Sequence, residues 1–403
     1  MTRPLVAVVG AGLAGLVAAV SAHAAGADVV VLERDEGPGG ATAASAGWIW
    51  RYRDIATARL LAPRGDHAIH EVLVSGLDDS LAWLEGQGVR LIARGTGRSF
   101  TDGARIDPVQ ALGALADRLP DDAVQRRTAV VDARRASGGG HELLVRRARP
   151  GGLAAAPPAW VPADAVVFCG GGYALDHDRI ARESRTPPQV SERWLLRAPR
   201  GGDGTSMAAA LALGAVRMPG TGECMTRLAI DLDDATSPES IRVGELLVPD
   251  ATLLDGDGAP IERAQHDWSG ALAAWDLARR SGRGRVVLPR AALRTELHAG
   301  TVEDALRAAI AAGAMSGRTG DGGVWLDVAA GITHTRCGLR IDPDGRLLEA
   351  VESRIGRRTR ERALPRAFAA GMDAADVGLG GTASGLAQAL VFGRRAGAAA
   401  VTS

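Results

Sequence analysis

Apolar runs at the start of the chain predict a strand, a helix and a second strand. Residues 5–9 are apolar and mostly β-branched, and residues 29–32 form a second run of the same kind. Between the two runs, alanines and valines dominate as far as His23, which suits a helix. Short continuous apolar runs are typical of parallel strands buried on both faces. The pattern therefore predicts a βαβ unit and an α/β fold.

Later patterns continue this alternation of helices and strands. Apolar residues at helical spacing predict amphipathic helices at 77–88 and 108–119. Further elements are expected as strands at 129–132, 142–146 and 165–169, an alanine-rich helix at 205–213, and a final helix at 386–401.

The glycine turns that separate these elements stop between residues 222 and 322. This stretch is charged, rich in arginine and helical in pattern, and it contains Trp268 and Trp275. Strand patterns resume from Trp325 and recur at 339–341 and 367–370. We interpret the middle stretch as a second domain inserted into the first.

A glycine-rich turn joins the first predicted strand to its helix. Gly10, Gly12 and Gly15 have the GxGxxG spacing, and Glu33 ends the second strand roughly 20 residues later. Gly10 allows a tight turn, Gly12 lets backbone amides approach a pyrophosphate, and Gly15 lets helix and strand pack closely. Glu33 can accept hydrogen bonds from ribose hydroxyls, which argues against a 2′-phosphate at that position. The turn predicts a site for an adenine dinucleotide.

The charge balance excludes several classes of partner. Lysine plus arginine number 47, as do aspartate plus glutamate, so no net field favours nucleic acid or an anionic membrane. Every one of these basic residues is arginine, which excludes a catalytic lysine. Cys169, Cys224 and Cys337 fit neither a metal-binding spacing nor a disulfide framework, so we expect no metal. Because residues 5–15 lack the features of a signal peptide or a membrane span, we expect a cytoplasmic protein.

Four motifs follow one another along the chain. The first is the glycine fingerprint, which continues through Glu33 and Arg34 to a glycine- and serine-rich loop at 39–47. The others are a strand and glycine turn at 166–173, a Gly-Asp-Gly sequence at 202–204, and a C-terminal group at 332–342, 369–373 and 392–397. Over nearly the whole chain this order resembles the flavoproteins of the fumarate reductase, succinate dehydrogenase and 3-ketosteroid dehydrogenase superfamily.

The resemblance implies an α/β fold in two parts. A Rossmann-like FAD-binding domain, with a parallel sheet and helices on both faces, would comprise residues 1–221 and 323–403. An inserted α+β capping domain would comprise residues 222–322. The substrate would lie between the domains, and the end of the chain at its last helix leads us to expect a stand-alone enzyme.

The resemblance also implies roles around the flavin. Asp373 would face the ribityl chain, Val130 would present backbone atoms to adenine, and the N-terminus of the last helix would lie at the pyrimidine ring. Ala41 stands where covalent members carry a histidine, so FAD would be held non-covalently. The residues expected to bind FAD are Gly10, Gly12, Ala14, Gly15, Glu33, Arg34, Gly40, Ala41, Thr42, Ser45, Ala46, Gly47, Val130, Gly170, Gly171, Asp203, Asp373, Ser384, Gly385 and Leu386.

Members of this superfamily move a hydride between flavin N5 and a carbon beside a carbonyl or carboxylate, forming or reducing a C=C bond. His334 would hold the oxygen of a small substrate. In the cap, His266 would act as general acid or base, oriented by Asp267. Arg336 is a candidate carboxylate clamp, because a guanidinium offers a bidentate fork. Arg340 and Arg227 are further candidates for that role.

Two departures keep other reactions open. Gly378 and Leu379, not an arginine, precede the last Gly-Gly, and the chain's two tyrosines are too few for a ketosteroid dehydrogenase site. The alternatives are an FAD-dependent oxidase or monooxygenase of an amine or hydroxy acid, and a flavin-binding protein without turnover. No second dinucleotide fingerprint occurs, so no tightly bound nicotinamide is expected, and the electron donor or acceptor is left open.

Overall fold

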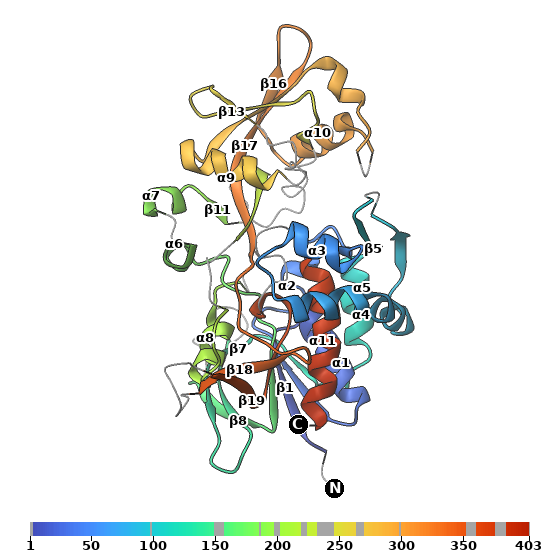
Figure 1. The fold of residues 1–403 in the computed structure, drawn as a ribbon, viewed down its shortest axis with the longest axis vertical. Coiled ribbons are helices and arrows are strands. Elements are labelled where there is room, and N and C mark those ends of the chain that lie inside the picture. Colours follow the sequence, from blue (N-terminus) through green and yellow to red (C-terminus); the bar gives the residue numbers. More distant parts are fainter. Residues whose placement is uncertain are drawn as a thin grey trace. The chain divides into compact units, whose positions relative to one another are not determined.

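The chain forms two units, each built around its own sheet (Figure 1). The first unit comprises Met1–Tyr173, Arg200–Gly220 and Arg336–Ser403, and the second comprises Ala174–Pro199 and Thr221–Thr335. The computed structural model describes residues 3–96, 99–148, 157–184, 187–196, 202–218, 224–231, 246–262, 270–297, 300–351, 360–374 and 384–402.

A six-stranded sheet forms the core of the first unit. Its order is β18 (Arg346–Val351), β19 (Arg360–Ala369), β10 (Ala165–Phe168), β1 (Leu5–Val9), β2 (Asp28–Leu32) and β6 (Val124–Gln125). All neighbours are parallel except the antiparallel pair β18 and β19. In β1, Val6, Ala7 and Val8 have no exposed surface, as the continuous apolar run requires. The predicted Rossmann-like α/β fold is confirmed.

Two helices from opposite ends of the chain pack against each other beside this sheet. They are α1 (Leu13–Ala24) and α11 (Gly385–Thr402), which lie side by side in Figure 1. A Cβ atom at Gly397 would lie 2.2 Å from the carbonyl oxygen of Ala18, and one at Gly393 would lie 2.8 Å from that of Ala14. Glycine at these two positions therefore allows the helix backbones to approach closely.

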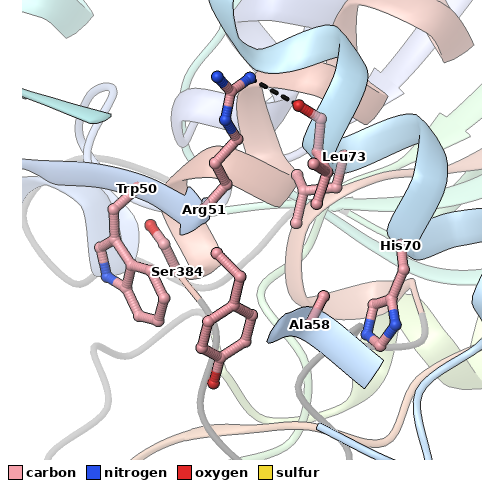
Figure 2. Close-up of a pocket in the computed structure, with 8 residues that line it drawn as sticks. Trp50, Arg51, Ala58, His70, Leu73 and Ser384 are labelled. Atoms are coloured by element: carbon pink, nitrogen blue, oxygen red, sulfur yellow. Dashed lines mark hydrogen bonds between the residues drawn. The ribbon is translucent and has the colours of Figure 1, made fainter. Parts of the chain in front are cut away.

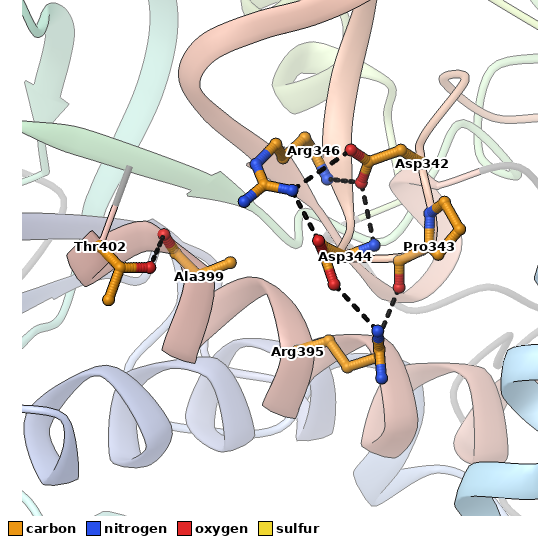
Figure 3. Close-up of polar contacts among 7 residues, drawn as sticks. All are labelled: Asp342, Pro343, Asp344, Arg346, Arg395, Ala399 and Thr402. Atoms are coloured by element: carbon orange, nitrogen blue, oxygen red, sulfur yellow. Dashed lines mark hydrogen bonds and ion pairs between the residues drawn. The ribbon is translucent and has the colours of Figure 1, made fainter.

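An ion-pair network holds the middle of α11 to the turn before β18 (Figure 3). The Arg395 guanidinium donates to Asp344 at 2.9 Å and to the carbonyl oxygen of Pro343 at 2.5 Å. Arg346 donates to the other oxygen of Asp344 at 2.6 Å and also pairs with Asp342. The turn and the helix are thus linked through one shared carboxylate.

Smaller elements complete the first unit. The predicted helices correspond to α4 (His67–Gly86), α5 (Pro108–Ala116) and α8 (Thr205–Ala212), and α2 (Gly40–Ala43) and α3 (Ile55–Leu61) are short. One three-stranded sheet contains β3 (Trp48–Tyr52), β5 (Thr101–Ile106) and β4 (Leu91–Arg94), and another contains β7 (Thr128–Arg135), β8 (His141–Arg147) and β9 (Ala159–Ala163). The stretch 339–341, predicted as a strand, forms only isolated bridges through Leu339 and Ile341.

The second unit is organised by one long strand, β17 (Val324–Thr335). It pairs with β11 (Leu195–Leu196), β12 (Cys224–Ile230), β15 (Arg283–Leu288) and β16 (Ser316–Arg318), and the sheet continues to β13 (Thr252–Asp255) and β14 (Pro260–Ile261). The helices are α6 (His177–Ser184), α7 (Pro188–Ser191), α9 (Ala271–Arg280) and α10 (Val302–Ala311), with a 3₁₀ segment at Arg290–Arg294. The unit is therefore a mixed sheet with helices, which agrees with the α+β fold implied by the family resemblance, although the sequence pattern of residues 222–322 indicated a helical segment.

The second unit also extends beyond the predicted cap of 222–322. It takes in residues 174–199 and all of β17, which the sequence pattern had grouped with the first domain. The reason is the pairing of β17, which forms hydrogen bonds with β12 and β15 along most of its length and belongs to their sheet.

Among the described residues, no helix is long and apolar enough to cross a membrane.

The contact between α1 and α11 gives a first test. Substituting Gly397→Ala should destabilise the protein by roughly 1–3 kcal/mol, because the added methyl group overlaps the Ala18 backbone and forces the helices apart. Urea denaturation followed by circular dichroism measures the change. Gly113→Ala in α5 is the matched control, since a Cβ atom there meets nothing within 4 Å and alanine favours the helix. Equal stability of the two variants would contradict the packing argument.

Candidate functional site

The first glycine turn brings three backbone segments closer than side chains would permit. Gly10 has φ +95°, and its N–H donates to the carbonyl oxygen of Leu32 at 2.9 Å. A Cβ atom at Gly10 would lie 2.7 Å from the carbonyl oxygen of Cys169, and one at Gly15 would lie 1.9 Å from that of Gly10. The glycines expected for a tight turn and a close helix contact therefore occupy positions where only glycine fits.

The N-terminus of α1 has the features of an anion site. Gly12 is the N-cap residue and provides no side-chain cap, while a Cβ atom there would find its nearest neighbours, Gly39 and Thr42, at 3.7 Å. The N–H of Leu13 donates to the hydroxyl of Thr42 at 3.0 Å, and Ala14 lies in the same turn with 7% of its surface exposed. The positive end of a helix dipole favours a phosphate group.

Glu33 lies at the end of β2 and is 7% exposed. Its carboxylate accepts the N–H of Ala11 at 2.5 Å through Oε2 and that of Asp35 at 2.9 Å through Oε1. Burial raises the pKa of Glu33 above its usual value, and the two backbone hydrogen bonds oppose that rise. The carboxylate is thus held in a fixed orientation directly beside the first glycine turn.

The loop expected along the flavin is held by its own hydrogen bonds. Gly40 has φ +58° and begins the short helix α2, which also contains Ala41 and Thr42. The hydroxyl of Ser45 donates to the carbonyl oxygen of Thr42 at 2.7 Å and accepts the N–H of Gly47 at 3.2 Å. Between them, the carbonyl oxygen of Ala46 accepts from the side chain of Arg105 at 3.2 Å.

Arg34 and Asp203, predicted from two separate motifs, form a bidentate ion pair. The guanidinium donates to the two carboxylate oxygens at 2.7 and 3.2 Å. Asp203 also accepts the N–H of Thr205 at 3.0 Å. Burial would raise the pKa of Asp203, but hydrogen bonds from Arg34 and Thr205 outweigh it, so that the pKa is lowered. The pair links the end of β2 to the start of α8.

The carboxylate of Asp373 is fully buried against the second glycine turn. It accepts the N–H of Gly170 at 2.6 Å, the N–H of Gly172 at 2.9 Å and the hydroxyl of Ser206 at 2.6 Å. Gly171, between the two donors, has φ +93°. Ser206 was not predicted, although its place two residues after the Gly-Asp-Gly motif was a signal for it.

Burial and the neighbouring Asp373 carboxylate raise the pKa of the Cys169 thiol well above its usual value. Cys169 is therefore a neutral packing residue beside this turn.

Ser384 caps the last helix. Its hydroxyl accepts the N–H of Ala387 at 3.2 Å and donates to the carbonyl oxygen of Trp48 at 3.1 Å, which ties α11 to β3. Gly385 and Leu386 form the first turn, and a Cβ atom at Gly385 would lie 2.9 Å from the Cε atom of Met372. The start of α11 is thus anchored on both sides.

A small cavity opens beside this helix start (Figure 2). It is lined by Trp50, Arg51, Tyr52, Ala58, His70, Leu73, Val74 and Ser384. The rings of Trp50 and Tyr52 meet edge to face with centroids 5.5 Å apart. His70, on α4, is 2% exposed. Apart from Ser384, these residues carried no motif and were not predicted.

The expected adenine contact, Val130, lies on β7. It is 4% exposed and precedes an irregularity in the pairing of β7 with β8. A bulge of this kind disrupts the regular ladder and turns backbone groups away from it. The contact of Val130 with adenine stays a prediction.

The residues expected to bind substrate lie in two different units. His334 is near the end of β17, where it is paired with Met225 of β12, and its Nδ1 atom lies 3.2 Å from the hydroxyl of Thr333. Arg336 begins the return of the chain to the first unit. Arg340 forms an ion pair with Glu361 at 2.9 Å, which occupies one side of its guanidinium.

Several predicted positions lie outside the described residues. They are His266, Asp267 and residues 378–381. The described Arg227 lies on β12 opposite Gly331. Within the described ranges, no group of three or more histidine, cysteine, aspartate or glutamate residues is placed to hold a metal ion.

Comparison with known protein families finds a match in the segment that contains the first glycine turn. Residues 6–151 match the family model described as FAD binding domain. The fumarate reductase (cytochrome) of Shewanella frigidimarina is 30% identical to this chain in an alignment covering 44% of this chain and 34% of that protein. The chain spans about a third of the length of the curated relatives it matches.

Solved structures extend the likeness to the whole fold. The open conformation of a flavocytochrome c3 fumarate reductase superposes with a TM-score of 0.74 at 18% identity, covering 99% of this chain and 78% of that one. The 3-ketosteroid-delta4-(5alpha)-dehydrogenase of Rhodococcus jostii, in complex with 4-androstene-3,17-dione, has a TM-score of 0.68 at 20% identity, covering 98% of this chain and 96% of that one. Both units of the present fold therefore occur together in these proteins.

Proposed function

We propose that the protein is an FAD-dependent oxidoreductase, because residues 6–151 match the family model described as FAD binding domain. The reaction proposed is the formation or reduction of a C=C bond beside a carbonyl or carboxylate in a small substrate. The observation that supports this proposal most directly is the arrangement of the first glycine turn, the start of α1 with glycine as its N-cap residue, and the Glu33 carboxylate.

The residues at this turn fit an adenine dinucleotide. Gly12 leaves the start of α1 without an N-cap side chain, which suits a pyrophosphate. Glu33, oriented by Ala11 and Asp35, is positioned to accept ribose hydroxyls. Ala41 has no group that could bond covalently to a flavin, which supports non-covalent binding.

The reaction divides between the cofactor and the chain. Bound FAD supplies a carrier for two electrons as a hydride. His334 would hold the carbonyl or carboxylate oxygen of the substrate and thereby acidify the neighbouring carbon, while Arg336 would offer a second, bidentate contact. A separate side chain must take or give the proton, and His266 remains the candidate for that role. The relatives named as fumarate reductase and ketosteroid dehydrogenase support this class of reaction.

Glu33 allows a test of cofactor binding by pH. Because its pKa is raised, FAD affinity should fall on acidification through a midpoint above 4.5, the usual value for a glutamate. Above that midpoint the carboxylate is charged and accepts the ribose hydroxyls, and below it the contact weakens. Glu33→Gln should raise the Kd for FAD roughly ten- to a hundredfold, the cost of losing a hydrogen bond to a charged group, and should remove the pH step. Isothermal titration calorimetry between pH 4.5 and 8 measures both effects. An unchanged Kd in the variant would sink the assignment.

The reaction is tested with the flavin as indicator. Anaerobic reoxidation of the reduced enzyme by α,β-unsaturated acids and ketones, or reduction of the oxidised enzyme by their saturated forms, is the expected result. His334→Ala should lower kcat/KM roughly ten- to a hundredfold because the substrate oxygen loses its hydrogen bond. His23→Ala, at the last turn of α1, is the matched control and should leave kcat/KM unchanged.

Other outcomes of that assay distinguish the alternative reactions. Rapid hydrogen peroxide release with amines or hydroxy acids would identify an oxidase, and oxygen insertion would identify a monooxygenase. Full FAD occupancy without flavin reduction or reoxidation by any substrate would contradict the proposed reaction while leaving the binding of FAD intact.

A further inference from the structure

The side chain of Asp373 is enclosed by its own chain. The side chain has no exposed surface, and it collects hydrogen bonds from Gly170, Gly172 and Ser206. The partners lie 203, 201 and 167 positions away in sequence, respectively. Removing a buried carboxylate from such donors leaves the donors without a partner, which costs more than the loss of one bond.

One of the donors, Gly170, is among the residues expected to bind FAD. A Cβ atom at Gly170 would lie 2.2 Å from the Cβ atom of Ser206, so the second glycine turn packs directly on the first turn of α8. The carbonyl oxygen of the preceding residue, Cys169, lies 2.7 Å from the position that a Cβ atom at Gly10 would take. A shift of the second glycine turn would therefore be transmitted to the first one.

The segment that carries Asp373 also touches both long helices. It is a short 3₁₀ turn, Gly371–Asp373. A Cβ atom at Gly371 would lie 2.9 Å from the Cβ atom of Ala14 on α1, and the carbonyl oxygen of Gly371 accepts from Gln388 on α11 at 3.4 Å. The second glycine turn, the start of α8, and the helices α1 and α11 thus all contact this turn.

We propose that Asp373 is a positioning residue, which holds the second glycine turn and the start of α8 in the shape that receives FAD. This assignment rests on the proposed binding of FAD and differs from the ribityl contact that the family resemblance implies. Its physical basis is that the described hydrogen bonds of the carboxylate are made within the chain and need no ligand. The site is then formed before the cofactor arrives, which lowers the cost of ordering it on binding.

The test uses Asp373→Asn in the full chain, measured with FAD removed and with FAD added back. The amide keeps the size of the side chain but turns one acceptor into a donor facing other donors. The Tm of the cofactor-free chain should fall by about 5 °C or more. The Kd for FAD, measured by calorimetry at 15 °C where both proteins are folded, should rise at least tenfold.

The matched control is Asp255→Asn in the second unit. Asp255 is also buried and also accepts two backbone N–H groups, from Asp257 and Ala259. The control should lower the Tm of the cofactor-free chain while leaving the Kd for FAD unchanged. A purely stabilising role of a buried aspartate is thereby separated from positioning.

Each other result overturns the proposal in a distinct way. A lower Tm with an unchanged Kd makes Asp373 merely structural, whereas a raised Kd with an unchanged Tm of the cofactor-free chain makes it a direct contact to FAD. If Asp373→Asn does not fold, Ser206→Ala decides, because it removes one donor and should shift both quantities in the same directions by a smaller amount. If the wild-type chain binds no FAD, the proposed function itself is refuted. The Tm of the cofactor-free variants then still shows whether Asp373 stabilises the second glycine turn.

Discussion

The close approach of backbones around α1 is the constraint on which the rest of the first unit depends. Gly15 brings the helix onto the first glycine turn, and Gly393 and Gly397 bring α11 close to Ala14 and Ala18 of the same helix. Side chains at these positions would overlap backbone atoms, so the helices would be pushed outward. The close contact between α1 and α11 would then be lost.

Buried carboxylates accept backbone N–H groups of the two glycine turns. Glu33 accepts backbone N–H groups at the first glycine turn, and Asp373 does so at the second. Tight turns leave amide groups pointing inward, and an unsatisfied buried amide is costly. A carboxylate can accept several hydrogen bonds at once and therefore suits such turns. Both acids were expected to contact FAD. We propose that the Glu33 carboxylate both holds its turn and binds FAD, whereas the Asp373 carboxylate only holds its turn.

Features that depend on residues close together in the sequence could be predicted, whereas features that depend on distant residues could not. The βαβ unit and its glycine turn are determined within about 30 residues, and their pattern was sufficient to predict the Rossmann-like fold; the binding of a dinucleotide at the turn stays a prediction. The partnership of Ser206 with Asp373 joins residues 167 positions apart, and no local pattern reveals it. The same limit explains β17, whose strand character was visible from Trp325 while its partner strands, and hence its unit, were not. The segment 339–341 had the apolar residues of a strand but forms only isolated bridges.

Composition narrows the chemistry further than the fold does. With no lysine, the chain cannot form an imine with a carbonyl substrate, and two tyrosines, one of them fully buried, leave little scope for phenolic proton transfer. Arginine is a permanent cation and a poor proton donor, so it serves here mainly for orientation, as in the bidentate pair of Arg34 and Asp203. In the proposed function, FAD would supply the reactive centre, and the side chains would need only to bind the substrate and handle one proton.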